Sequence, residues 1–269
     1  MALGDRRLRR IGLGTNRITD TEAARTLLRR AVELGVELID TADIYQATAS
    51  ETTIGATLGG DHPRVVVATK GGMVRTAEGY GADGRPEYLR TALVASLRRL
   101  GADRIDLYQL HRVDPHVPIE LSVGALREMQ REGLLRWIGL SNVTVEELDR
   151  ARREATIVSV QNRYNLLDRE HEAVLEYCER HGIVFLPWTP FRRGGISEEP
   201  VLAEMAARLG ATAHQLALRW LLWRSPVVLP IPGTLSVRHL EENLAAAALV
   251  LEQEELRRLG ELAPPAARP

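Results

Sequence analysis

The chain alternates short apolar runs with longer stretches in which apolar residues recur at helical spacing. In the longer stretches the apolar positions return every three or four residues, which predicts amphipathic helices. The short runs are rich in Val, Ile and Leu and predict strands. They occupy residues 10–14, 36–41, 64–69, 105–110, 136–140, 157–161, 183–187 and 227–231. The pattern therefore predicts eight strands, each followed by a helical crossover.

Helix boundaries carry signals of their own. Pro86 opens one predicted helix, and Gly101 ends it; proline suits a first helical position and glycine the position after the last. Thr144 is followed by Glu147 three residues later, which is the spacing of a capping box, and a second box begins at Thr212. These signals support the helical interpretation of the segments between the strands.

Eight strand–helix units in about 250 residues favour a closed barrel over an open sheet. The open, doubly wound sheet is the alternative, but its nucleotide fingerprint fails, because Arg17 follows Gly12 and Gly14 where a third glycine is required. We therefore expect an α/β fold, a single-domain (β/α)₈ TIM barrel over residues 1–269. A short hairpin over residues 2–9 should precede it, and one extra C-terminal helix should follow over residues 252–262.

Composition excludes several classes of partner. Hydrophobic residues make up 45% and charged residues 26% of the 269, as in ordinary globular proteins. The net charge is −1, so we expect neither a nucleic-acid nor a membrane partner. The basic N-terminus lacks the apolar core of a secretion signal. Cys178 is the only cysteine, and no metal-ligand cluster stands out, so we expect a cytoplasmic protein without a metal.

Lys70 is the only lysine among 35 basic residues. The other basic residues are arginines, which codon bias in a GC-rich genome would explain. A lysine kept in such a chain needs a reason of its own. Because lysine is a compact point charge whose pKa can be shifted, it suits chemistry better than arginine does. Lys70 is therefore the first candidate for a catalytic residue.

Function in such a barrel gathers at the C-terminal ends of the strands. Asp40, Lys70 and His111 end three neighbouring strands, and Tyr45 follows Asp40 by five residues. An ammonium near a phenol favours the phenolate and makes the tyrosine a better proton donor. The aspartate would hold the lysine, and the imidazole would orient a carbonyl oxygen. Each residue also has a structural alternative: an ion pair for Asp40, packing for Tyr45 and the core for His111. Together they suit proton delivery to an oxygen while hydride reaches the carbon.

Six stretches resemble a known family. They are DTADIY at residues 40–45, ATK at 68–70, DLYQLH at 106–111, GLSN at 139–142, VQN at 160–162 and IPGTLSVRHLEEN at 231–243. With these motifs in this order, nearly the whole chain resembles the aldo-keto reductases. The resemblance implies a catalytic tetrad of Asp40, Tyr45, Lys70 and His111, with Tyr45 as general acid in an NADPH-dependent reduction of a carbonyl compound.

The resemblance also implies a cofactor site. Ser141, Asn142 and Gln161 would hold the nicotinamide amide, and Trp188 would stack on its ring. Thr189 and Phe191 would lie along the pyrophosphate, and Glu242 and Asn243 would meet the adenine. The polar end of the first strand adds Gly14, Thr15 and Asn16, beside Asp40.

Departures from the family pattern affect the choice of cofactor. Gly233 stands where many members carry a lysine for the 2′-phosphate, which leaves Thr234, Arg238 and His239 as candidates. Arginine can make a forked contact with phosphate, so NADPH (NADP+) is favoured and NADH stays open as an alternative. Gln46 replaces the glycine that commonly follows the tyrosine.

The chain stops soon after its last predicted helix, where many members of the family have a long loop that covers the substrate. We therefore expect an open pocket. The glycine-rich loop 71–85 should be mobile and should line the pocket with Asn16. Arg75, Arg112, Arg192 and Arg193 fall near the rim. They either form an ordinary solvated surface or attract anionic substrates.

Substrate choice and function class keep alternatives. Within the family, the stretches at 139–144, 160–165 and 231–234 are similar to bacterial reductases of the pyridoxal reductase (pyridoxine 4-dehydrogenase) kind. A pyridoxal-type, sugar or natural-product carbonyl is therefore the expected substrate class, although such loops diverge quickly. One alternative is a non-catalytic NADPH-binding regulatory subunit, like those of potassium channels. Another is a barrel lyase that uses Lys70 as a Schiff base. The sequence does not decide between a monomer and a homo-oligomer.

Overall fold

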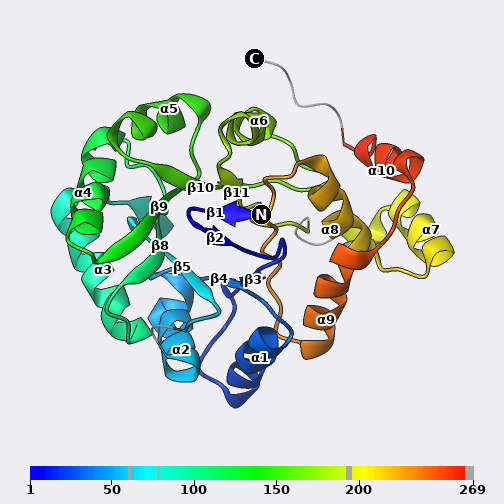
Figure 1. Ribbon diagram of the computed structural model, residues 1–269, viewed down its shortest axis with the longest axis horizontal. Coiled ribbons are helices and arrows are strands. Elements are labelled where there is room, and N and C mark those ends of the chain that lie inside the picture. Colours follow the sequence, from blue (N-terminus) through cyan, green and yellow to red (C-terminus); the bar gives the residue numbers. More distant parts are fainter. Residues whose placement is uncertain (60–61, 78, 192–195, 264–269) are drawn as a thin grey trace.

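Parallel strands form a curled sheet at the centre of the computed structural model, which describes residues 1–59, 62–77, 79–191 and 196–263 (Figure 1). Neighbouring strands follow one another in chain order and all pair in parallel. They are β3 (Leu13–Gly14), β4 (Leu38–Asp40), β5 (Val66–Gly71), β8 (Ile105–Leu110), β9 (Leu135–Ser141), β10 (Ile157–Gln161) and β11 (Val184–Phe185). The first seven predicted strands are confirmed, the first, second and seventh in shortened form.

The eighth predicted strand, residues 227–231, is not a regular strand. Proline has no N–H to donate, and Pro230 and Pro232 interrupt the ladder here. Their carbonyls nevertheless accept the N–H groups of Gly12 and Gly14 at 3.0 and 3.2 Å, and isolated bridges join this segment to β3 and β11. The segment thus closes the (β/α)₈ barrel, as the sequence predicts, without forming a continuous ladder.

Helices surround the sheet in Figure 1. The ring consists of α1 (Glu22–Glu33), α2 (Ala49–Leu58), α3 (Pro86–Leu100), α4 (Ile119–Arg131), α5 (Val145–Glu154), α6 (Glu172–His181), α8 (Ala213–Arg224) and α9 (Val237–Ala245). Two further helices, α7 (Pro200–Leu209) and α10 (Gln253–Gly260), pack outside against α8. The short 3₁₀ turns are η1 (Tyr45–Thr48), η2 (Ile196–Glu198) and η3 (Ala246–Ala248). The predicted extra helix near the C-terminus is α10.

The predicted helix signals occur where expected, with small shifts. Both capping boxes form, at the start of α5 and of α8. Pro86 is the first residue of α3, and Gly101 ends that helix in the left-handed conformation. The helix predicted to begin near residue 168 begins instead at Glu172, because the chain first turns at Asn165 and Asp168.

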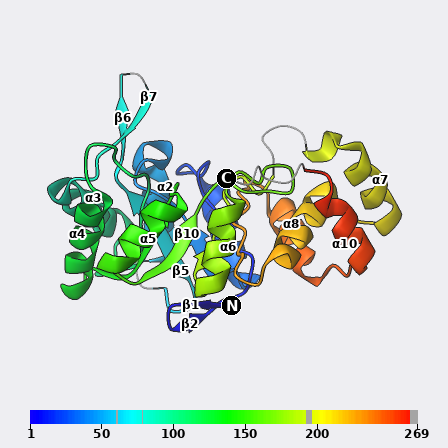
Figure 2. The same ribbon diagram turned by 90° about the horizontal axis from the view of Figure 1, so that it is seen from above.

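The predicted N-terminal hairpin closes one end of the barrel (Figure 2). It pairs β1 (Ala2–Leu3) with β2 (Arg6–Arg7). Leu3 and Leu8 are buried in one cluster with inward-facing barrel residues. The turn at Gly4 has φ +56°, and a Cβ there would lie 2.2 Å from the Trp137 indole. Only glycine therefore fits where the hairpin meets the barrel wall.

A second hairpin projects from the opposite end of the barrel in Figure 2. We expected residues 71–85 to form a mobile loop, but β6 (Met73–Thr76) pairs with β7 (Gly79–Ala82) in antiparallel register. Asp114 fixes the base, because its Oδ2 accepts the Gly84 N–H at 2.9 Å. The sequence of β6, Met-Val-Arg-Thr, does not alternate between apolar and polar residues, and the many glycines nearby favoured a loop.

The described residues contain no helix long and apolar enough to cross a membrane.

Candidate active site

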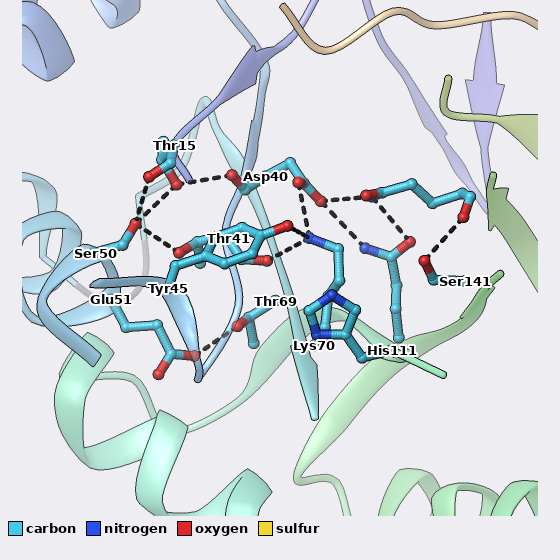
Figure 3. A network of polar contacts seen from close by, with 12 residues as sticks. Thr15, Asp40, Thr41, Tyr45, Ser50, Glu51, Thr69, Lys70, His111 and Ser141 are labelled. Atoms are coloured by element: carbon cyan, nitrogen blue, oxygen red, sulfur yellow. Dashed lines mark hydrogen bonds and ion pairs between the residues drawn. The ribbon is translucent and has the colours of Figure 1, made fainter. Parts of the chain in front are cut away.

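Lys70 lies at the centre of a buried polar cluster at the C-terminal ends of β4, β5 and β8 (Figure 3). Its side chain is fully buried. Its Nζ donates to Asp40 Oδ2 at 2.8 Å, to the Thr41 carbonyl at 2.7 Å and to Tyr45 Oη at 3.2 Å. The structure thus joins three of the four predicted catalytic residues in one network, with the lysine between the carboxylate and the phenol.

His111 lies beside this network. Its ring meets the Tyr45 ring edge-on, with centroids 5.9 Å apart. Burial, together with the positive charges of Lys70 and Arg112, lowers the pKa of His111 well below its usual value. His111 is therefore neutral at neutral pH and can donate one hydrogen bond. Its Nδ1 is buried without a partner among the described residues.

Burial and the lysine act on Tyr45 in opposite directions. Lys70 lowers the pKa of Tyr45, as we expected, but burial raises it by more, so the net pKa is above its usual value. The expected effect of the lysine is present, but we did not include the opposing effect of burial when reading the sequence. Burial also lowers the pKa of Lys70, but Asp40 and Tyr45 outweigh that effect and the net pKa is raised. The lysine consequently remains an ammonium.

The second oxygen of Asp40 is also bonded. Its Oδ1 accepts from Gln161 Nε2 at 2.8 Å and from Gln109 Nε2 at 3.3 Å. We gave Gln109 no role from the sequence. Its position two residues before His111 was the available signal, because residues two apart on a strand point to the same face.

Two further carboxylates near the site, Glu51 and Asp43, were missed by the sequence analysis. Glu51 is fully buried; its carboxylate accepts from Thr69 at 2.5 Å and from Arg99 Nε at 2.6 Å. Asp43 Oδ1 is buried and has no hydrogen-bond partner in the described part of the chain. Burial and the nearby Glu51 raise the pKa of Asp43 to about 7.

The residues predicted to hold a nicotinamide form a connected row. Ser141 Oγ donates to the Gln161 carbonyl at 2.8 Å. Asn142 Nδ2 donates to Ser141 Oγ and to the His111 carbonyl, both at 3.0 Å, and Asn142 Oδ1 accepts from Trp188 Nε1 at 3.2 Å. The indole is thus fixed beside the catalytic cluster.

Two residues of the mouth have left-handed backbones. Asn142 has φ 56° and Thr189 has φ 54°. A β-branched residue seldom adopts this conformation, and such strain gathers at functional sites. The Thr189 carbonyl accepts from Asn165 Nδ2 at 3.1 Å, and Phe191 packs edge-on against His214 at 4.5 Å between centroids.

The three cofactor-binding candidates at the end of the first strand differ in whether their polar groups are already bonded within the protein. Thr15 is buried; its hydroxyl donates to the Asp40 carbonyl at 2.8 Å and accepts from Ser50 at 2.9 Å, so it is committed within the protein. Gly14 pairs with Gly233 where the barrel closes. The Asn16 carbonyl accepts from Gln46 at 2.9 Å.

The candidates for phosphate and adenine contact lie just before α9 and along it. Arg238 is exposed; its guanidinium donates to Glu242 Oε1 at 3.2 Å and lies 3.1 Å from His239 Nε2. Thr234 Oγ1 accepts the N–H of Ser236, which caps the helix. Asn243 is buried on the same helix.

The rim arginines are only partly described. The guanidinium of Arg75 lies 5.5 Å from the centroid of the Tyr80 ring on the projecting hairpin. Arg112 is exposed next to His111. Arg192 and Arg193 lie outside the described residues. Within the described ranges, no group of three or more His, Cys, Asp or Glu side chains could hold a metal ion.

Comparison with known proteins agrees with this geometry. Residues 10–264 match the model of the Aldo/keto reductase family. The chain belongs to the aldo/keto reductase family. This aldo/keto reductase is 42% identical to an uncharacterized oxidoreductase from Schizosaccharomyces pombe, over 96% of this chain and 88% of that protein. It is 38% identical to pyridoxine 4-dehydrogenase from Escherichia coli, over 96% of each chain.

A solved structure of an aldo/keto reductase from Klebsiella pneumoniae in complex with NADP and acetate superimposes with a TM-score of 0.86. It is 31% identical, and the match covers 97% of this aldo/keto reductase and 93% of the other chain. The expected family and barrel fold are thus confirmed.

Proposed function

We propose that this protein is an NADPH-dependent enzyme that reduces an aldehyde or ketone to an alcohol, with Tyr45 as the general acid. The observation that carries the proposal is the position of Lys70 Nζ, which bonds both Asp40 Oδ2 and Tyr45 Oη in a buried site. A structural lysine would not need to meet a phenol there. The Klebsiella relative in complex with NADP supports the choice of cofactor.

The residues around the mouth fit a dinucleotide. Asn142 and Ser141 offer polar groups for the nicotinamide amide, and the Trp188 indole, held by Asn142, offers a flat surface for its ring. At the start of α9, the exposed guanidinium of Arg238 and the helix N-terminus suit a phosphate. When bound, NADPH would supply the hydride.

The side chains of the site would deliver the proton. Tyr45 accepts a hydrogen bond from Lys70, so its own O–H is free to donate to a carbonyl oxygen. As the proton leaves, the Lys70 ammonium stabilises the phenolate, and this offsets part of the rise in the pKa of Tyr45 that burial causes. Neutral His111 would donate a hydrogen bond to the same oxygen and orient the substrate.

For the substrate we propose a pyridoxal-type aldehyde, with sugar or natural-product carbonyls as the second class. The support is the 38% identity with Escherichia coli pyridoxine 4-dehydrogenase over 96% of each chain. Pyridoxal, 4-nitrobenzaldehyde and an aldose should be compared by the loss of NADPH absorbance. The proposal would be contradicted if the enzyme turned over none of the three compounds.

The same assay separates the other function classes. A regulatory subunit would bind NADPH, detected by its fluorescence, without oxidising it in the presence of any carbonyl compound. A Schiff-base enzyme would bond covalently to its substrate at Lys70 on borohydride treatment. Oxidation of NADPH without such trapping is the result that we expect.

A further inference from the structure

Gln109 contacts the oxygen of Asp40 that the lysine does not use. Lys70 Nζ bonds Oδ2 at 2.8 Å, whereas Gln109 and Gln161 both donate to Oδ1, at 3.3 and 2.8 Å. All four residues are no more than 2% exposed. Water therefore cannot easily replace a donor that is lost, and without Gln109 the amide of Gln161 would be the only donor to Oδ1 among the described residues.

The barrel wall leaves a space into which Gln109 fits. In the strand register Lys70 is the partner of Gln109, Gln109 of Gly139 and Gly139 of Ser159, so these residues form one level across β5, β8, β9 and β10. A Cβ on Gly139 would lie 2.9 Å from Gln109 Cγ and 2.4 Å from Ser159 Oγ. The Gln109 side chain can therefore occupy this position only because Gly139 has no side chain.

The two glutamines also contact each other. Gln161 Nε2 lies 3.5 Å from Gln109 Oε1 besides its bond to Asp40. Both amide hydrogens of Gln161 therefore have acceptors within the protein, and among the described residues its Oε1 has no donor, which leaves it for a donor from outside. Gln161 is also one of the residues that we expected beside the nicotinamide, so Asp40 is bonded directly to the expected cofactor site.

We propose that Gln109 is a positioning residue, which holds Asp40 so that Oδ2 stays on Lys70 and Lys70 stays on Tyr45. This inference rests on the proposed carbonyl reduction. The terminal bond of a carboxylate rotates easily unless its oxygens are bonded, and two donors on Oδ1 fix the plane of Asp40 more firmly than Gln161 alone would. Because Asp40 stabilises the ammonium of buried Lys70, a displaced Asp40 would weaken the support that the lysine gives to the phenolate.

The test replaces Gln109 with methionine, which keeps the volume and removes the amide. We expect kcat to fall roughly five- to twentyfold, which is less than the full loss of one hydrogen bond to a charged group because Gln161 still donates to Asp40, while KM and the NADPH dissociation constant stay within about twofold. The alkaline limb of the kcat profile should move to lower pH, because Lys70 would lose its proton more readily. Ser159→Ala is the matched control: it lies at the same level, its hydroxyl has no partner in the described chain, and we expect no change.

An unchanged kcat and alkaline limb in Gln109→Met would overturn the proposal, as would an equal loss in Ser159→Ala, which would indicate packing alone. If circular dichroism shows that Gln109→Met does not fold, Gln109→Glu replaces it, since it keeps the shape and substitutes an acceptor for the donor. Its activity should be low at neutral pH and recover as the pH falls and the glutamate gains a proton; wild-type activity throughout would refute the role of Gln109. A wild-type enzyme that oxidises no NADPH would instead refute the proposed function, and the inference with it.

Discussion

At the scale of single residues, composition was the strongest guide. The only lysine of the chain is the residue that bonds both a carboxylate and a phenol. Asp43 and Gln109 were missed because their importance depends on burial and on which oxygen they face, and neither property can be deduced from residue type. The net rise in the pKa of Tyr45 was missed for the same reason, since burial there depends on the packed site.

Asp43 gives a prediction on stability and pH. Its pKa is raised from 3.8 to about 7 in the folded protein, so between these values the native state binds more protons than the unfolded state. Stability therefore falls as the pH rises through this range, by up to about 4 kcal/mol in total. Asp43→Asn should remove this fall and be more stable than the wild type at pH 8, measured by urea unfolding at several pH values. Asp103→Asn, at an exposed turn, is the control; a wild-type pH dependence in Asp43→Asn would contradict the account.

At the scale of elements, local signals predicted more than long-range ones did. Both capping boxes and the Pro86–Gly101 helix formed as expected, since each depends on residues close in sequence. The eighth strand and the β6–β7 hairpin depend instead on hydrogen bonds to another segment of the chain. Prolines limited the first, and the second has many glycines and no alternation of apolar and polar residues, so the final form of neither could be deduced from composition.

The turn after Tyr45 predicts a stabilising substitution. Ala47 has φ 52°, which costs an L-residue about 1 kcal/mol and glycine little. Ala47→Gly should therefore stabilise the protein by roughly 0.5 kcal/mol once the greater freedom of unfolded glycine is deducted. Ala49→Gly, with φ −60° at the start of α2, should destabilise it. A lower urea midpoint for both variants would show that the left-handed turn carries no strain.

The start of α9 predicts cofactor choice. Arg238 is exposed and charged, so Arg238→Ala should raise the NADPH dissociation constant ten- to a hundredfold and barely change that of NADH. NADH is the internal control, because it lacks the 2′-phosphate. Equal effects on both cofactors, measured by fluorescence titration, would mean that Arg238 does not contact that phosphate.

At the scale of the whole molecule, the order of elements predicted the barrel, because eight strand–helix units have few other ways to bury strands on both faces. The N-terminal hairpin and the helix α10 also matched. That residues 1–269 form a single domain stays a prediction. The surface of the mouth could not be predicted, since loop conformation sets which arginines face a substrate.

The rim charge is tested with pyridoxal and pyridoxal 5′-phosphate. If Arg75 and Arg112 attract anions, kcat/KM should favour the phosphorylated aldehyde at low salt, and the preference should fade as salt screens charges beyond about 10 Å. The neutral aldehyde controls for general effects of salt on the enzyme. No preference at low salt would leave these arginines as ordinary surface.

The central claim is that Tyr45, supported by Lys70 and Asp40, donates the proton in carbonyl reduction. Tyr45→Phe removes one hydroxyl and keeps the ring against His111, so the most direct measurement is its kcat beside its NADPH affinity. We predict a loss of about 10²- to 10⁴-fold in kcat with nearly unchanged NADPH binding. Turnover close to that of the wild type in Tyr45→Phe would contradict the claim.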